Sequence, residues 1–174
     1  MKFKVVDCDA ARAEEILEIL NEAIINSTAL WDYAPRSPSA MGAWFAAKQS
    51  GGFPVLGVTD ERGTLAGFAS YGPFRHFPAY KYTVEHSVYI HVAYRGRGLG
   101  KLLLEALIQR AEASNYRAMI AAIDDDNEVS KALHQRLGFT CCGVIREAGY
   151  KFGRWLDLAL YQRLLSGPPQ PVDG

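Results

Sequence analysis

The chain has few cysteines, no excess of charge of either sign and no long hydrophobic run. Its 174 residues include three cysteines, Cys8, Cys141 and Cys142. Their odd number and the lack of a C-x-x-C spacing disfavour both a disulfide framework and a zinc site. Nineteen basic and nineteen acidic residues give a net charge of zero, so no global field holds nucleic acid or an anionic membrane. Any anion site must therefore be local.

The sequence carries no sign of export or of membrane insertion. The N-terminus soon turns polar, and no run approaches the roughly 18 apolar residues of a membrane span. We therefore expect a soluble, cytoplasmic protein with neither a nucleic-acid nor a membrane partner. A length of 174 residues suits one domain. We expect that domain over residues 1–165 and a flexible, proline-rich tail over residues 166–174.

The hydrophobic patterns predict a mixed sheet. We expect the order β α α β β β α β α β β, over residues 3–6, 10–26, 40–49, 54–59, 64–71, 83–92, 101–115, 119–123, 128–137, 141–146 and 155–162. A helix between the fourth and fifth strands implies parallel pairing there, whereas hairpins imply antiparallel pairing elsewhere. Neither an internal repeat nor a second domain is evident.

A glycine-rich turn joins the fourth strand to the third helix. Residues 95–100 read Arg-Gly-Arg-Gly-Leu-Gly, and Lys101 follows. Glycines let the backbone turn sharply and approach a ligand, and a helix N-terminus adds partial positive charge. Leu102 stands where a Walker loop needs Ser or Thr, and the glycine spacing does not fit a dinucleotide fingerprint. The turn is either an anion cradle of another kind or a flexible turn with solvated arginines.

A polar helix face follows the fifth strand. Asn127, Ser130 and His134 share one face by their i, i+3 and i+7 spacing. The opposite face is expected to point to the core and carries Val129, Leu133 and Leu137. Asn127 suits a helix N-cap, which is a purely structural alternative to ligand binding. His134 can give or accept a proton near neutral pH, although a surface histidine is often merely solvated.

The fourth strand carries unusual polar residues for a central strand. Its alternation puts Glu85, Ser87, Tyr89 and His91 on one face and Val84, His86, Val88, Ile90 and Val92 on the other. A carboxylate at Glu85 must be hydrogen-bonded, linked to water in a cleft, or exposed at an edge. In a cleft, desolvation would raise its pKa and equip it as a base.

The loop before that strand carries more binding chemistry than a connector needs. Residues 72–82 contain prolines, aromatics, Arg75 and His76. The four histidines lack metal-ligand spacing, and the acidic run at 124–126 lacks the glycine of a calcium loop, so we expect no metal.

Taken together, these motifs resemble those of the GCN5-related N-acetyltransferases (GNAT). Residues 95–100 match the acetyl-CoA loop of that family, which reads Gln or Arg, x, x, Gly, x, Gly or Ala. Asn127, Ser130, His134 and Gly138-Phe139 are similar to its second coenzyme A element, although many members have Tyr in the place of His134. Three blocks, TVEHSVYI, LHQRLGF and GYKFGRWLDL, look like phosphinothricin and methionine sulfoximine or sulfone acetyltransferases.

The resemblance implies a fold and a donor. The fold would be α+β, a three-layer GNAT fold with a mixed, mostly antiparallel sheet of six to seven strands. Strands four and five would splay apart, and helices would cover both faces. The donor would be acetyl-CoA. Its binding residues would be Val88, Tyr89, Ile90, Val92, Arg95, Gly96, Arg97, Gly98, Leu99, Gly100, Lys101, Asn127 and Ser130.

The resemblance also implies a reaction. Acetyl would pass directly, through a tetrahedral intermediate, to the α-amino group of a small amino-acid-like acceptor. Glu85 and His134 would be the catalytic pair, with Glu85 as the base and His134 as the acid or as a partner in the base role. The acceptor would contact Arg75, His76, Phe77, Glu85, His86 and Ser87. A homodimer is expected, with residues 150–155 near a shared site. The alternatives are a peptide or protein N-acetyltransferase and a non-catalytic acyl-CoA sensor.

Overall fold

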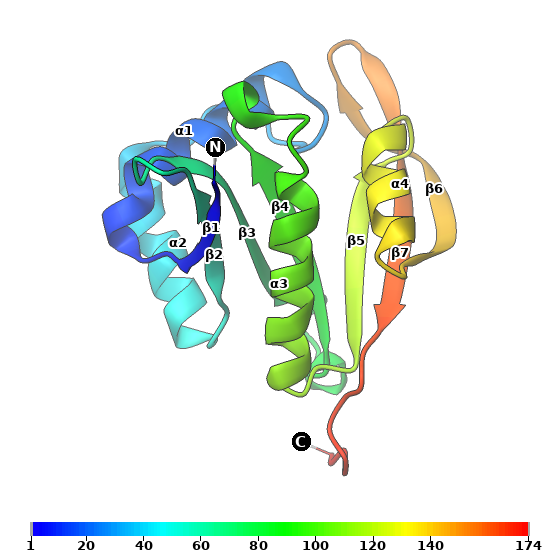
Figure 1. Ribbon diagram of the computed structural model, residues 1–174. Coiled ribbons are helices and arrows are strands. Elements are labelled where there is room, and N and C mark those ends of the chain that lie inside the picture. The colour runs from blue at the N-terminus through cyan, green and yellow to red at the C-terminus, as the bar shows by residue number, and fades with distance from the viewer. Residues whose placement is uncertain (1, 174) are drawn as a thin grey trace. The chain divides into compact units, whose positions relative to one another are not determined.

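Seven strands and four α-helices are found over the described residues 2–173 of the structure, a computed structural model (Figure 1). The strands are β1 Lys4–Asp7, β2 Val55–Thr59, β3 Leu65–Pro73, β4 Thr83–Ile90, β5 Ala118–Asp124, β6 Thr140–Lys151 and β7 Arg154–Leu164. The α-helices are α1 Ala13–Asn26, α2 Pro38–Ser50, α3 Leu99–Ala113 and α4 Glu128–Arg136. Three 3-10 turns are η1 Ala10–Arg12, η2 Pro78–Tyr80 and η3 Val92–Tyr94. Within these residues no helix has the length and apolar character needed to cross a membrane.

The predicted order of helices and strands is confirmed, and the structure differs from the prediction at the ends of individual elements. Asp9 caps η1, which precedes α1, since its side chain accepts from the N–H of Ala11 at 2.9 Å. Ser37 stands at the N-cap of α2, but its hydroxyl bonds Ser39 instead of the helix backbone. The last two strands are longer than expected, because their hairpin pairs continue to Lys151 and Arg154.

The chain forms two compact units. One contains the residues up to Tyr71 together with Ser87–Leu107, and the other contains Gly72–His86 together with the residues from Ile108 on. Both β4 and α3 run through the two units. The hydrogen-bonded strand order is β1-β2-β3-β4-β5-β7-β6.

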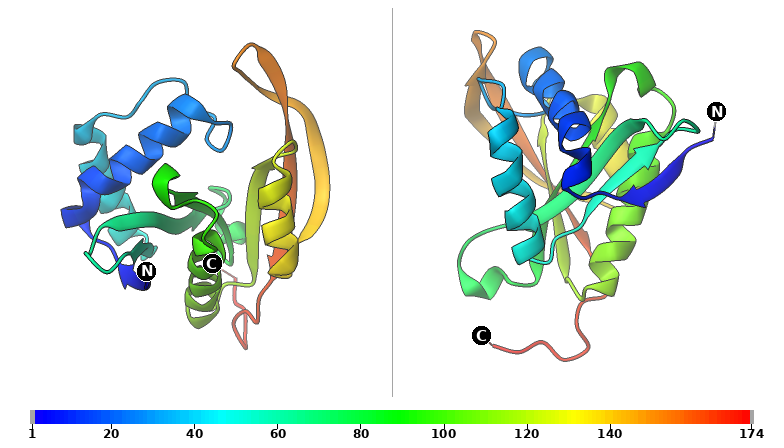
Figure 2. Two further views of the ribbon diagram at one scale, coloured as in Figure 1. Left: turned by 45° about the horizontal axis from the view of Figure 1, so that its top comes forward. Right: turned by 90° about the vertical axis from the view of Figure 1, so that its left-hand side faces the viewer.

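In the first unit, helices cover both faces of the strands. All residues of β2 and nearly all of β3 are buried, as expected for strands that are covered on both sides. On one face α1 and α2 pack against them through Ile16, Ile19, Leu20, Met41, Val55, Leu65 and Phe68. The first half of α3 lies on the other face (Figure 2, right). Burial of each such large side chain contributes about 1.5–3 kcal/mol.

In the second unit, β5 has one parallel and one antiparallel neighbour. The start of β4 runs parallel to β5 with the pairs Thr83↔Ala118, Val84↔Met119 and Glu85↔Ile120. β7 runs antiparallel to β5 along the whole length of β5, and β6 pairs antiparallel with β7. The expected mixed, mostly antiparallel sheet is confirmed. Among the described residues, the ladder between β4 and β5 ends at the pair of Glu85 and Ile120.

The C-terminal segment makes several contacts in the second unit. The N–H of Leu165 donates to the carbonyl of Arg117 at 2.9 Å, and the Arg117 guanidinium donates back to the Leu165 carbonyl at 2.8 Å. Further on, the N–H of Val172 donates to the Tyr82 hydroxyl at 3.2 Å. The flexible character of residues 166–174 stays a prediction.

Candidate active site

The glycine-rich turn of the first unit has a backbone that only glycine adopts readily. Gly96 and Gly98 both have φ of 76°, in the left-handed region. A Cβ at either position would meet no heavy atom within 4 Å, so the requirement is conformational rather than steric. α3 begins directly afterwards at Leu99, whose side chain is buried. The first N–H groups of a helix have no intrahelical acceptor, which makes this turn a suitable cradle for an anion.

The cations of this turn have partners within the protein. The Arg95 guanidinium binds the carboxylate of Glu22 on α1 and donates to the Ile90 carbonyl at 3.3 Å. Arg97 lies over the Tyr94 ring, 5.5 Å from its centroid. The Lys101 ammonium is 3.7 Å from the Glu105 carboxylate. Arg95 therefore anchors the turn to α1, a role that the sequence did not indicate.

The part of β4 in the first unit is held tightly against β3. At Gly67 an added Cβ would lie 2.8 Å from the carbonyl oxygen of Tyr89, so no side chain fits there. The Tyr89 ring packs on Phe68 at 5.5 Å between centroids. The strand ends at Ile90, and Val92 lies in η3 with 53% of its surface exposed. The predicted donor-binding residues of β4 thus lie on a closely packed segment that leads into the glycine turn.

The polar face of α4 carries the buried residue His134, while Asn127 and Ser130 are half-buried. Asn127 caps the helix, since its side-chain oxygen accepts from the N–H of Ser130 at 3.0 Å. His134 is 6% exposed, whereas Val129 is 83% exposed. The expectation that Val129 points to the core is therefore wrong, whereas Leu137, expected on the same face, is buried. Hydrogen bonds at both ring nitrogens of His134 offset the cost of burying this polar side chain. The pattern of apolar residues along the sequence does not reveal these bonds.

His134 and His86 form a buried imidazole pair. Their Nε2 atoms lie 2.9 Å apart. The Nδ1 atom of His86 is 3.0 Å from the Ile120 carbonyl, and that of His134 is 2.7 Å from the Ser130 carbonyl. Burial lowers the pKa of both imidazoles, and the hydrogen bonds to backbone carbonyls oppose that effect. Both nitrogens of each imidazole thus lie within hydrogen-bond distance of protein groups.

Glu85 lies on the other face of β4. Its side chain keeps access to solvent, but partial burial raises the pKa of its carboxyl, and the charge of Arg75 opposes this rise. The Arg75 guanidinium lies 4.9 Å from the ring centroid of Phe74. His76 and Phe77 are exposed beside it. The second unit thus brings Glu85 and the Arg75 loop within electrostatic reach of each other.

Two contributors to the site escaped the sequence-based prediction. Glu22 gives no local signal of its pairing with Arg95, because 73 residues separate them. Ile120 contributes through its carbonyl group, which no side-chain pattern reveals. Within residues 2–173 no group of three or more His, Cys, Asp or Glu side chains is arranged to hold a metal ion.

The chain is similar to known proteins in both sequence and structure. Residues 14–139 match the acetyltransferase (GNAT) family. An L-methionine sulfoximine/L-methionine sulfone acetyltransferase of Pseudomonas paraeruginosa is 44% identical over 162 residues, 93% of this chain and 94% of that protein. The structure of a protein from Acinetobacter baylyi ADP1 superposes with a TM-score of 0.98 at 57% identity, over 99% of this chain and 98% of that one. A phosphinothricin acetyltransferase from Sinorhizobium meliloti, solved with acetyl-CoA, gives a TM-score of 0.94 at 37% identity, over 100% and 94% of the two chains.

Proposed function

This chain belongs to the acetyltransferase (GNAT) family, and we propose that it is an acetyl-CoA-dependent N-acetyltransferase of small amino-acid-like amines. The observation that carries the proposal is the 44% identity over 93% of the chain to an enzyme named for methionine sulfoximine and methionine sulfone. A relative of the same fold was solved with acetyl-CoA, the donor proposed here. The acceptors are of the phosphinothricin, methionine sulfoximine or methionine sulfone type.

The donor site is assigned first to the glycine turn. The positive φ angles of Gly96 and Gly98 and the start of α3 at Leu99 support binding of a pyrophosphate by the N–H groups of residues 97–101. Lys101 adds positive charge beside them. The remaining donor-binding residues are Val88, Tyr89, Ile90, Val92, Asn127 and Ser130. Acetyl-CoA, when bound, supplies an acyl group as a thioester.

The acceptor must lose a proton before it can act as a nucleophile. An α-ammonium has a pKa of about 8, so a base helps at neutral pH. Glu85 is the base in this proposal, because its carboxyl is accessible and burial raises its pKa. Arg75 binds the acidic group of the acceptor, and His76, Phe77 and Ser87 complete the acceptor contacts. His134 is the second catalytic residue in this proposal.

The acetyl-transfer reaction itself provides the test. The purified protein is incubated with acetyl-CoA and one of phosphinothricin, L-methionine sulfoximine, L-methionine sulfone, a set of amino acids or a short peptide, and the N-acetyl product is measured by mass spectrometry. We expect saturable transfer to the amino-acid-like acceptors and none to the peptide. Transfer to the peptide alone would favour a protein N-acetyltransferase. Tight acetyl-CoA binding without any product would favour a sensor.

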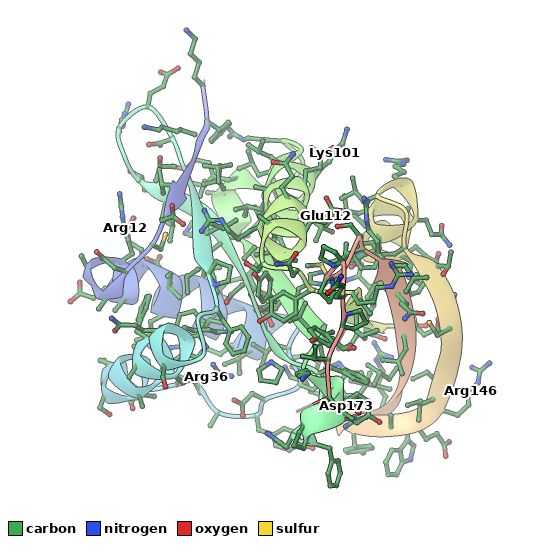
Figure 3. All side chains as sticks on the ribbon, turned by 90° about the horizontal axis from the view of Figure 1, so that it is seen from below. Arg12, Arg36, Lys101, Glu112, Arg146 and Asp173 are labelled. Atoms are coloured by element: carbon green, nitrogen blue, oxygen red, sulfur yellow. The ribbon has the colours of Figure 1, made fainter. Side chains whose placement is uncertain are left out.

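We further propose a homodimer formed through the β6–β7 hairpin. Large apolar side chains are exposed there: Ile145, Tyr150, Phe152 and Trp155, the last with 59% of its surface. Tyr150 and Trp155 lie edge to face at 5.0 Å between centroids. Arg146 extends from the outer side of β6 (Figure 3). Sedimentation is expected to give a dimer that Trp155→Glu converts to a monomer, whereas a monomeric wild type would contradict the proposal.

Free thiols support the proposed cytoplasmic location. Cys141 and Cys142 are adjacent, exposed and free in β6. Such thiols persist in the reducing cytoplasm, whereas disulfides form readily in oxidising compartments. We therefore propose a cytoplasmic location.

A further inference from the structure

Three short contacts fix where protons can lie in the pair of His86 and His134. They are Nδ1 of His86 to the Ile120 carbonyl at 3.0 Å, the two Nε2 atoms at 2.9 Å, and Nδ1 of His134 to the Ser130 carbonyl at 2.7 Å. A carbonyl oxygen only accepts, so each Nδ1 bonds its carbonyl only when it carries a proton. The Ser130 hydroxyl, 3.4 Å from Nδ1 of His134, is a longer contact to the same nitrogen.

The contact between the two Nε2 atoms needs one proton in every case. At 2.9 Å two bare lone pairs would repel each other, and two N–H groups would clash. All three contacts are satisfied when the pair holds three protons, one more than two neutral imidazoles carry. Burial favours the neutral pair instead, whose two protons satisfy two of the three contacts. One proton lies between the rings in the charged pair, and also in the neutral pair when one imidazole carries its proton on Nε2.

Within residues 2–173 the rings face few other polar groups. His86 on β4 and His134 on α4 each pack against the ring of Phe139, at 5.4 and 5.1 Å between centroids. From β5 the facing group is the Ile120 carbonyl, and from α4 it is Ser130. The nearby ionisable groups are directed elsewhere, since Glu85 lies on the other face of β4 and Lys131 of α4 binds Asp125 and Glu128. The charge that acts on His86 is therefore that of His134.

We propose that His86 is a positioning residue that holds the imidazole of His134 through one proton shared between their Nε2 atoms. The bond fixes the ring orientation and tautomer of His134, and the backbone of Ile120 in turn fixes those of His86. Because any proton gained or lost by His134 changes what His86 can donate or accept, the two rings titrate as one unit. The kinetic consequence rests on the proposed function, whereas the shared proton does not.

Nuclear magnetic resonance of the full-length protein labelled with ¹⁵N-histidine tests the shared proton directly. We expect a scalar coupling across the hydrogen bond between two Nε2 resonances of the four histidines. The coupling should be lost in His86→Gln and kept in His91→Gln, a matched change at a histidine outside the pair. Two Nε2 resonances of His86 and His134 without mutual coupling, each titrating independently, would overturn the proposal.

Kinetics with two substitutions separate positioning from packing. We expect His86→Leu to lower kcat about tenfold, with little change in the KM for acetyl-CoA. In the profile of kcat against pH, the limb that reports the titration of His134 should shift. His86→Gln should restore part of kcat, because its amide can donate to Nε2 of His134. If His86→Leu does not fold, His86→Gln still carries the test through its pH profile.

The outcomes distinguish this proposal from the proposed function. A lower melting temperature with an unmoved pH limb in both variants would reduce His86 to a structural role and overturn the inference. If the wild type shows the coupling but acetylates no acceptor, the proposed function fails and the shared proton stands. If the wild type acetylates its acceptors but shows no coupling, the shared proton fails and the proposed function stands.

Discussion

The Arg95 guanidinium is held by the Glu22 carboxylate, so the first cation of the glycine turn is tied to α1. About half of the Arg95 side chain is exposed, and such partly exposed ion pairs contribute about 0.2–1 kcal/mol. The pair therefore orients the turn more than it stabilises the fold.

Glu22→Gln is expected to raise the KM for acetyl-CoA by about two- to fivefold without changing kcat, because the turn loses its anchor. Steady-state kinetics measure this directly. A lower KM would mean that Glu22 competes with the donor for Arg95, and would contradict the anchoring role. In a double-mutant cycle with Arg95→Ala, the two effects should not add.

Gly98→Ala isolates the effect of the backbone conformation. The φ of 76° places the residue in the left-handed region, where an L-residue costs about 1–2 kcal/mol, and no neighbouring atom crowds an added Cβ. We expect a loss of about 1 kcal/mol in the free energy of unfolding, measured in urea, and a higher KM for acetyl-CoA.

A matched control is available in α2. Gly42 is also uncrowded but lies in a helix interior, so Gly42→Ala should stabilise the protein by roughly 0.5–1 kcal/mol. Gly98→Asn should cost less than Gly98→Ala, because asparagine tolerates the left-handed region better. If Gly98→Asn and Gly98→Ala lowered the free energy of unfolding equally, the backbone conformation of Gly98 would not be the source of the strain.

Arg75→Ala should change the pH dependence of catalysis as well as acceptor binding. The charge of Arg75 lowers the pKa of Glu85 against the rise caused by burial, so its removal raises that pKa further. A base must be deprotonated to act, and the acid limb of kcat/KM is therefore expected to move to higher pH. A profile of kcat/KM against pH measures the shift, which Arg75→Lys should largely prevent. An unmoved limb in Arg75→Ala would remove Glu85 as the base.

Lys48 gives a pH-dependent contribution to stability in the first unit. Burial lowers the pKa of its ammonium from 10.5 to about 8, and its Nζ donates to the Tyr71 carbonyl at 2.8 Å. Between these pH values the unfolded chain binds more protons at this residue than the folded one, so folding gains stability as the pH rises. We expect wild type to gain stability relative to Lys48→Met between pH 8 and pH 10, measured by urea unfolding.

Lys131 is the control for that measurement. Hydrogen bonds to Glu128 and Asp125 raise the pKa of its ammonium, so it stays charged across the same interval. The difference between wild type and Lys131→Met should therefore stay constant from pH 8 to pH 10. If the difference in free energy of unfolding between wild type and Lys48→Met were also constant from pH 8 to pH 10, it would contradict the proposed burial of the Lys48 charge.

Local patterns were sufficient for most of the fold. The alternation of β4 and the glycines before α3 predicted a strand, a turn and a helix, because these features depend on neighbours along the chain. The parallel pairing of β4 with β5 also followed from the helix between them. By contrast, the apolarity of Val129 suggested burial, yet the tertiary structure buried His134 instead.

The sequence by itself determined the order of the elements, the glycine turn at 95–100 and the identity of the residues able to carry acid–base chemistry. Only the tertiary structure decided which of them meet. His86 and His134 are 48 residues apart, and their Nε2 atoms lie 2.9 Å from each other. The register of β4 on β5 ends at Glu85 and Ile120, where the next residue, His86, bonds the Ile120 carbonyl through its ring. Hydrogen bonds of this kind depend on the register of paired strands, which hydrophobic patterning leaves open.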